Sequence, residues 1–579
     1  MFQQILDPIA GSLVLSALFA ALPLVLLFVL LGVFKVKAPK AALASLALSL
    51  VLAIVGWQMP VAQALSATAA GIFYGLFPIL WILVNALWIY RLTVATPWFE
   101  VLGRTIRSIS NDLRILSILI AFCFGALLES LAGFGAPVAI SAAMLMAAGM
   151  KPLKSAIVSL LANTAPVAFG AMAAPIIALN GVTGLPLNEL SSMAGRQTPF
   201  IALIVPLLLV FIVDGRRGVK QTWPVALVAG VAFGAAQFVT SNYFAVELTD
   251  VVAAVVTVAA VLLMLKVWQP KETVGMGGAV QAAPEAAEAA PVGARAGAGP
   301  GSGASSKHSA GRPATGSAVR PDSAVPTDNS RPEPGQIWMA IAPYLIIIAV
   351  FSVAQIPFVK AWLSQVGSVT FAWPGLDITD SAGKPVAATK FKLDHLKATG
   401  TLLLFSGLLT MLLYKISASQ GLRVYRDTLV QLRWTIVTVT AVLGLSFVMN
   451  LSGQTTTLGF ALASAGGFFA VLSPLIGWIG VALTGSDTSS NSLFGQMQAT
   501  AAEQTGLSPV LMAASNSSAG VMGKMLSLQN LAVASAAVGL DGAEGTLFRK
   551  LLGWSLGLLA LITVLIFLQS TPVLGWMVP

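Results

Sequence analysis

Two parts of this 579-residue chain gather Gly, Pro, Ser, Thr and Asn in otherwise apolar surroundings. These two cassettes are residues 129–137 with 163–172, and residues 485–495 with 516–525. The spacing from Asn163 to Gly170 recurs from Asn516 to Gly523, and each cassette holds an acid and an Asn-containing segment that we expect to break a helix. Internal repeats of this kind are common in secondary transporters, whose binding sites lie where the two halves meet at mid-membrane.

The residue types of the cassettes favour a small anion as ligand. Helix breaks at membrane depth free backbone groups, which only protein or a water-filled cavity can satisfy. The N-terminal ends of broken helices present N–H groups and a positive dipole end to a carboxylate. Ser, Thr and Asn add neutral donors for a hydroxyl or carboxylate. A small hydroxy-acid anion fits this chemistry, as do other small anions and amino acids. The alternative is close packing of helices through small residues without any ligand.

Three ionisable residues lie within or beside the apolar segments: Glu129, Asp487 and Lys524. A charge at the centre of a membrane helix costs on the order of 2.5–3.5 kcal/mol, so it usually faces a cavity or a partner. Because low dielectric favours a neutral carboxyl, either acid is a candidate proton acceptor in a transport cycle. The alternatives are that the acids lie at the membrane boundary or that Asp487 caps a helix. Lys524 attracts a substrate carboxylate, pairs with an acid, or extends to the interface.

The composition requires a membrane around these residues. The chain is 57% hydrophobic and 9% charged, whereas soluble domains carry about 25% charged residues. Lipid must therefore solvate much of the surface. The net charge of +10 lies in short clusters between apolar runs, which is typical of topology-determining loops and not of a nucleic-acid-binding surface. With Cys123 alone and two histidines in polar segments, we expect no disulfide, no metal site and no cofactor. The absence of a Walker-type loop or a Ser-His-Asp set at membrane depth argues against an enzyme.

Apolar runs of about 20 residues, the length that crosses a bilayer, predict an all-α polytopic membrane protein. We expect about 12 to 14 transmembrane helices, in two internal repeats with broken or re-entrant segments. Five basic clusters fit the cytoplasmic side, which places both termini outside. Parity then puts residues 359–398 outside, despite five lysines there. The clusters are residues 35–40, 91–114, 216–220, 415–433 and 549–550.

A segment of different composition divides the chain. Residues 271–335 are rich in Ala, Gly, Pro and Ser and hold almost no large apolar side chains. Such a segment cannot bury enough surface to offset its ordering entropy, so we predict that it is disordered. It separates an N-terminal transmembrane half, residues 1–270, from a C-terminal half, residues 336–579.

Several long strings in the chain resemble, in order, those of the bacterial L-lactate permease family. They are residues 133–140, 163–172, 483–491, 520–525, 535–540 and 576–579. The resemblance covers nearly the whole chain on both sides of residues 271–335, which look longer and lower in complexity than the corresponding family loop.

The resemblance implies uptake of L-lactate with protons across the bacterial inner membrane, with D-lactate and glycolate as further substrates. It also implies kinship with the wider ion transporter superfamily, whose members use inverted repeats, helical hairpins and often an elevator-like movement. The substrate-binding residues that it implies are Gly133, Gly135, Asn163, Thr164, Ser515, Asn516 and Ser517. Glu129 and Asp487 are then the candidates for proton coupling, and Lys524 for anion attraction.

Other functions agree with the same residues. Abundant Ser, Thr and backbone carbonyl groups also suit a Na⁺-coupled carrier of another small carboxylate. A channel is a further possibility, although duplicated broken cassettes suit alternating access better. The residues alone do not rank the hydroxy acids or fix the proton stoichiometry, the orientation of the repeats or the oligomeric state.

Overall fold

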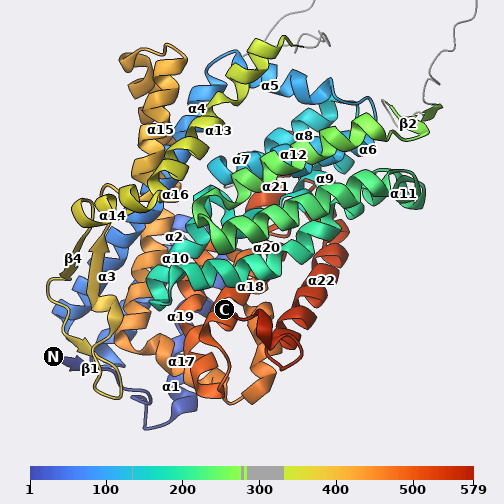
Figure 1. Cartoon of the computed structure of the whole chain (residues 1–579). Helices are drawn as coiled ribbons and strands as arrows, with labels where there is room; N and C mark the ends of the chain where they lie inside the picture. Colours follow the sequence, from blue (N-terminus) through green and yellow to red (C-terminus); the bar gives the residue numbers. More distant parts are fainter. Residues whose placement is uncertain (134, 276–279, 283–331, 541) are drawn as a thin grey trace, which may run out of the picture.

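The computed structural model describes residues 1–133, 135–275, 280–282, 332–540 and 542–579. Helices make up almost all of the ordered structure (Figure 1). The N-terminal half contains α1 (Leu13–Phe28), α2 (Ala38–Val55), α3 (Val61–Tyr74), α4 (Trp81–Val94), α5 (Trp98–Arg107), α6 (Leu113–Leu116), α7 (Gly125–Ala132), α8 (Ala136–Ala147), α9 (Pro152–Ala162), α10 (Gly170–Thr183), α11 (Leu187–Tyr243) and α12 (Thr249–Val267). The C-terminal half contains α13 (Pro334–Gln355), α14 (Pro357–Val366), α15 (Thr399–Leu413), α16 (Ala418–Ser452), α17 (Gln454–Ala463), α18 (Phe469–Thr484), α19 (Asp487–Thr505), α20 (Pro509–Lys524), α21 (Leu528–Ala537) and α22 (Glu544–Gln569).

Short π-helical and 3-10 segments connect or extend several of these helices. They are η1 (Val29–Val33), η2 (Gly75–Leu80), η3 (Ser117–Phe124), η4 (Val167–Phe169), η5 (Val246–Leu248), η7 (Ala387–Thr389), η8 (Gly466–Phe468) and η9 (Gly575–Met577). The strands form three separate pairs. They are parallel β1 (Phe2–Gln3) with β5 (Ile378–Thr379), antiparallel β2 (Glu272–Val274) with β3 (Val280–Ala282), and antiparallel β4 (Val369–Ala372) with β6 (Lys390–Leu393).

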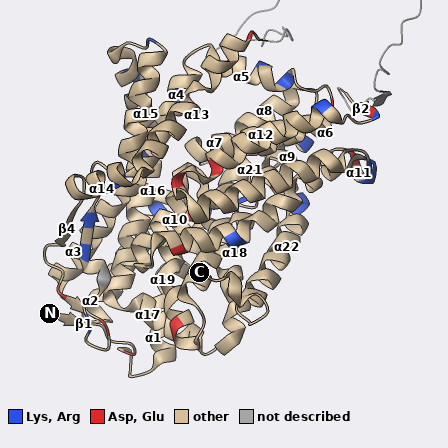
Figure 2. Ribbon diagram, viewed as in Figure 1, with Lys and Arg blue, Asp and Glu red and all other residues tan. Residues whose placement is uncertain are grey.

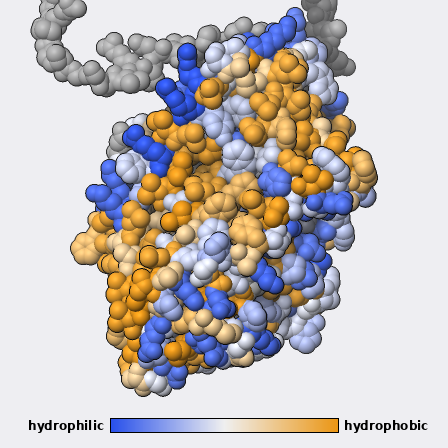
Figure 3. Space-filling view, turned by 90° about the vertical axis from the view of Figure 1, so that its left-hand side faces the viewer, coloured by the Kyte–Doolittle hydropathy of each residue, from blue (hydrophilic) through white to orange (hydrophobic). Residues whose placement is uncertain are grey.

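The surface and the helix lengths confirm a polytopic membrane protein. Among the described residues, 10 helices are long and apolar enough to cross a membrane, and the bent pair of α9 with η4–α10 raises the number to 11. Charged residues are sparse along the ribbon, and most of each helix is formed by other residue types (Figure 2). Broad hydrophobic areas cover the face in Figure 3, as expected for helices that contact lipid.

Helix α11 contains two antiparallel arms. The backbone turns back at Asp214 and Gly215, and Gly215 has φ +64°. Thr198 in the first arm donates to Gln237 in the second, over 2.9 Å. Counting the two arms separately brings the number of spans to the lower end of the expected range. Two further apolar helices, α8 and α15, are shorter than the helices counted as spans.

The two cassettes lie in a helical arrangement that occurs once in each half. In the N-terminal half, α7 and α8 form hairpin 1, and the broken pair α9–α10 follows, bent by 63°. In the C-terminal half, α18 and α19 form hairpin 2, and α20 and α21 follow with a break between them. Gly477 and Gly523 let α18 and α20 approach closely, because a Cβ atom at either position would meet backbone of the other helix. The structure therefore has two repeats of a hairpin followed by a broken helix.

The N-terminus and the segment 359–398 lie on the same face. Strand β1 pairs with β5, and the N-terminal amine lies 3.3 Å from the carboxylate of Asp377. This agrees with the parity argument that puts both on one side. The segment is also more structured than a loop, since it holds part of α14 and the β4–β6 hairpin. Which face is cytoplasmic stays a prediction. Most of the segment 271–335 lies outside the described residues, so its expected disorder also stays a prediction.

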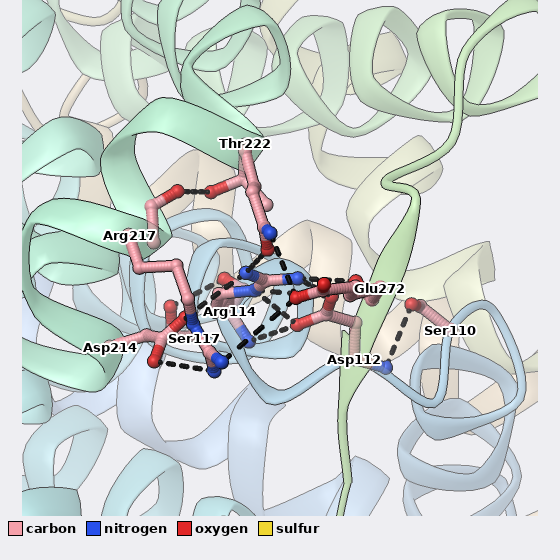
Figure 4. Close-up of polar contacts among 10 residues, drawn as sticks. Ser110, Asp112, Arg114, Ser117, Asp214, Arg217, Thr222 and Glu272 are labelled. Atoms are coloured by element: carbon pink, nitrogen blue, oxygen red, sulfur yellow. Dashed lines mark hydrogen bonds and ion pairs between the residues drawn. The ribbon is translucent and has the colours of Figure 1, made fainter. Parts of the chain in front are cut away.

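The buried side chain of Arg114 links several connecting segments through polar contacts (Figure 4). Arg114 is fully buried and binds both carboxylate oxygens of Asp112. It also donates to Asp214 at 3.1 Å, to Gln221 at 2.6 Å and to the backbone carbonyl of Glu272 at 2.6 Å. The network joins the start of α6, the turn of α11 and strand β2. Two of the basic clusters and the start of the segment 271–335 therefore lie together on one face.

We expect Arg114→Met to destabilise the protein strongly, because it leaves buried carboxylates without their cation, a change that costs about 3–5 kcal/mol in comparable buried pairs. Arg217→Met is the matched control: Arg217 binds the same Asp214 at 2.9 Å, but its side chain is 42% exposed. Thermal unfolding in detergent measures both variants. Equal midpoints for the two variants would contradict a structural role of the Arg114 network.

Candidate functional site

A small cavity lies where the two hairpin tips meet the broken helices. Its volume is about 30 Å³, which is room for one or two water molecules. The lining comes from both halves of the chain: Glu129, Gly133, Val167, Gly170, Ala171, Pro175, Gly485, Ser486, Asp487, Thr488 and Lys524. Residues far apart in the sequence thus form one pocket, as the paired cassettes predict.

Glycines shape the tip of hairpin 1. Gly133 ends α7 with φ +22°, and Gly135 precedes α8 with φ +87°. Residues with a side chain rarely adopt a backbone conformation with positive φ, whereas glycine does so without a steric penalty. Gly135 also packs against α21, where an added Cβ would lie 3.0 Å from the side chain of Asn530. Glu129 lies one turn before this tip, so the turn fixes the depth of its carboxylate.

Hairpin 2 places Asp487 in a corresponding position. Gly485 has φ +75° and ends α18, and Ser486 begins α19 as its N-cap by accepting from the backbone N–H of Ser489. Asp487 therefore occupies the first turn of α19, where a negative charge interacts favourably with the helix dipole. The N-cap is Ser486, which excludes the alternative that Asp487 itself caps this helix.

The strongest polar contact in the cavity is an ion pair between the two halves. Lys524 Nζ lies 2.5 Å from Glu129 Oε1. Both residues are buried, since Glu129 is 3% exposed and Lys524 is 5% exposed. Asn163 Nδ2 donates to the other oxygen, Glu129 Oε2, over 2.9 Å. Both oxygens of Glu129 are therefore satisfied, and Lys524 neither extends to an interface nor stays unpaired.

Asp487 has a less complete set of partners. Its Oδ2 accepts from Ser517 at 2.5 Å, whereas its buried Oδ1 has no hydrogen-bond partner among the described residues. A glycine makes room for each acid, because a Cβ at Gly170 would lie 2.9 Å from Glu129 Oε1 and one at Gly520 would lie 2.9 Å from Asp487 Oδ1. Each hairpin thus sets one acid against a glycine and a polar side chain of the following helix.

Helix N-termini also point toward the pocket. The first turn of α19 contributes Ser486, Asp487 and Thr488, and the start of α10 contributes Gly170, Ala171 and Pro175. Residues 171–173 have positive φ although none is glycine, so regular helix begins only after them. N-terminal N–H groups and the dipole favour an anion at both starts. Together with Lys524 they give the pocket the chemistry of a carboxylate site.

The predicted site residues separate into two groups. Glu129, Gly133, Asp487 and Lys524 line the cavity, and Asn163 and Ser517 contact it through the acids. The others have different contacts. Thr164 donates to the carbonyl of Leu161, Ser515 donates to that of Met512, and Asn516 binds Asn491 and Gln498. Ser515 therefore forms a hydrogen bond within α20, and Asn516 links α20 to α19 of hairpin 2. Gly135 contacts α21.

One expectation about the second cassette is wrong. Residues 516–523 do not break a helix, because α20 is continuous from Pro509 to Lys524. The breaks in this half lie at Gly485–Ser486 and at residues 525–527, between α20 and α21. The recurring spacing from Asn to Gly therefore marks a break in α9–α10 but not in α20.

Several residues at the site were not predicted. Val167, Gly170 and Ala171 in the first cassette, and Pro175 just after it, line the pocket without an assigned role, and so do Gly485, Ser486 and Thr488 in the second cassette. Asp250, near the start of α12, is a further buried acid, 0% exposed, that interacts electrostatically with Glu129 and Lys524. The sequence does show Asp250 as an acid at the start of an apolar run. This pattern did not identify a site residue, because an acid is also common at the N-terminus of an ordinary helix.

A much larger cavity, about 900 Å³, lies beyond the pocket along two of the same helices. Residues 177–184, in α10 and just after it, and the C-terminal half of α19 line it, together with Glu247 and parts of the segment 359–398. It therefore opens on the face that carries the N-terminus. We call it the vestibule. Among the described residues, no group of three or more His, Cys, Asp or Glu could hold a metal ion.

Comparisons with known proteins give a consistent result. Residues 16–573 match the family model described as L-lactate permease. The chain is 40% identical to a protein named L-lactate permease from Bacillus subtilis, over 100% of this chain and 99% of that one. It is 41% identical to a protein named glycolate permease GlcA from Escherichia coli K12, over 98% of each chain. A crystal structure of the YdaH transporter of Alcanivorax borkumensis aligns with a TM-score of 0.30 at 12% identity, over 82% of this chain and 87% of that one.

We expect Glu129→Met and Lys524→Met each to destabilise the protein, by about 3–5 kcal/mol, because each leaves one buried charge unpaired. The double variant leaves neither charge, so its loss of stability should be clearly smaller than the sum of the two. Thermal unfolding in detergent measures all three, with Lys151→Met as a control at an exposed lysine before α9. Additive losses would contradict the ion pair.

Proposed function

The chain belongs to the L-lactate permease family, and on this premise we propose that it is a secondary active transporter that takes up lactate and glycolate by proton symport across the bacterial inner membrane. The observation that carries the proposal is the 2.5 Å ion pair of Lys524 with Glu129, between the two hairpin tips. Its relatives are named permeases, not enzymes. Their names include a lactate and a glycolate carrier, which supports small 2-hydroxy-monocarboxylates as the substrate class.

The substrate carboxylate replaces the carboxylate of Glu129 as the partner of Lys524. The N-terminal turns of α10 and α19 border the same cavity and add N–H groups for an anion. The hydroxyl groups of Ser486 and Thr488 also line it and suit the 2-hydroxyl group that lactate and glycolate share. This arrangement explains why one site accepts both acids, since they differ only in a methyl group.

Protonation of Glu129 makes this exchange possible. With Lys524 bound to substrate, an ionised Glu129 would be a buried carboxylate without its cation, which is strongly unfavourable. A proton on Glu129 removes that charge, so the loaded pocket carries the same net charge as the empty one. Asp487 is the second candidate for proton coupling, because one of its oxygens is buried without a partner. If a second proton accompanies the anion, the membrane potential adds about 2.3 kcal/mol per charge per 100 mV.

Access to the site requires movement of the hairpins. The vestibule of about 900 Å³ admits a hydroxy acid easily, whereas the pocket of about 30 Å³ does not. Asp487 and Thr488 lie about 13 Å along the axis of α19 from Gln496, the first residue of this helix that lines the vestibule, given the helical rise of about 1.5 Å per residue. We infer that substrate enters from the vestibule when a hairpin tip opens, and that the closed tips then separate it from that face.

Uptake of labelled L-lactate into proteoliposomes tests the proposed function. We expect accumulation under an inward proton gradient, competition by D-lactate and glycolate, and saturable counterflow, which distinguishes a carrier from a channel. An imposed Na⁺ gradient without a proton gradient should have no effect. Accumulation driven by Na⁺ alone would favour the Na⁺-coupled alternative, and no uptake under either gradient would contradict the proposal.

We predict that Glu129→Gln lowers proton-driven accumulation by roughly hundredfold, the order of the effect of a positioned proton-transfer group. Counterflow needs no net proton movement and should continue, because the amide keeps the shape of the side chain and still offers Lys524 an oxygen. Glu100→Gln, an exposed acid in α5, is the matched control. Normal pH-driven accumulation in Glu129→Gln would exclude Glu129 as the coupling residue.

A further inference from the structure

A second buried acid lies behind the pocket and has no assigned role. Asp250, in the first turn of α12, is fully buried. Its Oδ2 has no hydrogen-bond partner among the described residues, and its Oδ1 accepts only a long bond of 3.4 Å from Gln237. An ionised carboxylate in such surroundings is strongly disfavoured. An intramembrane acid that a protein keeps under these conditions usually has a functional partner.

The surroundings of Asp250 connect it with the coupling acid. The ionisable groups that interact with it are Glu129 from α7 and Lys524 from α20. The α11 arms contribute only neutral groups, Gln237 and Thr198, and the described part of α10 contributes no ionisable side chain. Since Lys524 is already paired with Glu129, no cation among the described residues is left to pair with Asp250.

Gln237 forms a bridge from Asp250 to the helix break. Thr198 donates to its Oε1 at 2.9 Å, which fixes the orientation of the amide. Its Nε2 group then donates both to Asp250 and, at 3.3 Å, to the backbone carbonyl of Ala165. Ala165 lies in the break between α9 and α10, two residues after Asn163, which in turn donates to Glu129. The carboxyl of Asp250 is thus held against the segment that positions Glu129.

The other side of Asp250 leads to the vestibule. Glu247, in η5, precedes Asp250 by one turn and lines the vestibule. It accepts from Thr399 at 3.4 Å and is only partly buried. Three carboxyl groups therefore follow one another from the vestibule to the pocket: Glu247 at the vestibule, Asp250 in the buried interior and Glu129 in the pocket.

We propose that Asp250 is the proton donor that loads Glu129, with Glu247 as the group that receives protons from the vestibule. This inference rests on the proposed proton symport. In the loading step the O–H bond of Asp250 breaks, a new O–H bond forms on Glu129, and Lys524 is released to the substrate carboxylate. Asp250 becomes an anion for a short time, and a proton from the vestibule, through Glu247, then restores its O–H bond.

The decisive variant is Asp250→Asn, which keeps the shape of the side chain and an acceptor for Gln237. In proteoliposomes we expect lactate counterflow to stay within about twofold of the wild type, while proton-driven accumulation falls by roughly tenfold to hundredfold. The ratio of proton flux to lactate flux should fall as well. Asp250→Glu, which restores a carboxyl, should recover part of the accumulation.

Glu247→Gln and Glu503→Gln form a matched pair at the vestibule. Both acids line it, but Glu503 lies near the end of α19 and is not among the ionisable groups that interact with Asp250. Glu247→Gln should slow proton-driven uptake from that side with unchanged counterflow, and Glu503→Gln should do neither.

The outcomes separate this inference from the proposed function. No lactate transport by the wild type, or transport without protons, would overturn the proposed function itself. Proton-coupled wild-type transport with unchanged coupling in Asp250→Asn would overturn only the role of Asp250. Loss of counterflow in both Asp250→Asn and Asp250→Glu would assign Asp250 a structural role and would also overturn the inference.

Discussion

The fold depends on one requirement: a lysine buried in a membrane protein needs an anion. Lys524 at the end of α20 finds it in Glu129 of hairpin 1, 2.5 Å away and from the opposite half of the chain. The pair holds the two halves together at the point where both hairpins end. Gly170 and Gly520 accommodate the two buried acids, because a Cβ atom at either position would lie 2.9 Å from a carboxylate oxygen.

In each half, a buried hairpin acid accepts a hydrogen bond from the following helix, but the residues involved differ. Each half places an acid near a hairpin tip, Glu129 or Asp487, and binds it with a polar side chain of the following helix, Asn163 or Ser517. In the first half that side chain lies at a helix break, whereas in the second it lies inside the continuous α20. What is repeated is therefore the contact of a hairpin acid with the next helix, and not the position of the break. Such a contact tolerates divergence, since any short donor on the facing helix satisfies a carboxylate.

The sequence was informative where a residue type has few uses in a membrane. Glu129, Asp487 and Lys524 stood out because charges are expensive there, and the structure gathers all three in one pocket. Asn516 was harder to interpret, because Asn and small residues serve helix packing as readily as ligand binding. The structure shows its contacts with Asn491 and Gln498, and its role in binding stays a prediction. The pairing of Lys524 with Glu129 instead of Asp487 joins residues 395 positions apart, and local periodicity carries no information about such a contact.

The charge balance of the pocket links its structure to coupling. Lys524 is its one cation among the described residues, and Glu129, Asp487 and Asp250 are the acids near it. One cation can neutralise one anion, so each further carboxyl is most stable as the neutral acid. A substrate anion adds to this balance a charge that must be compensated before the hairpins close over it. In the mechanism we propose, protonation of Glu129 provides the compensation without a new cation, and the neighbouring acid Asp250 is the source of that proton within the protein. In the proposed symport, coupling then follows from the scarcity of positive charge in the pocket, because the anion is not enclosed until a proton has arrived.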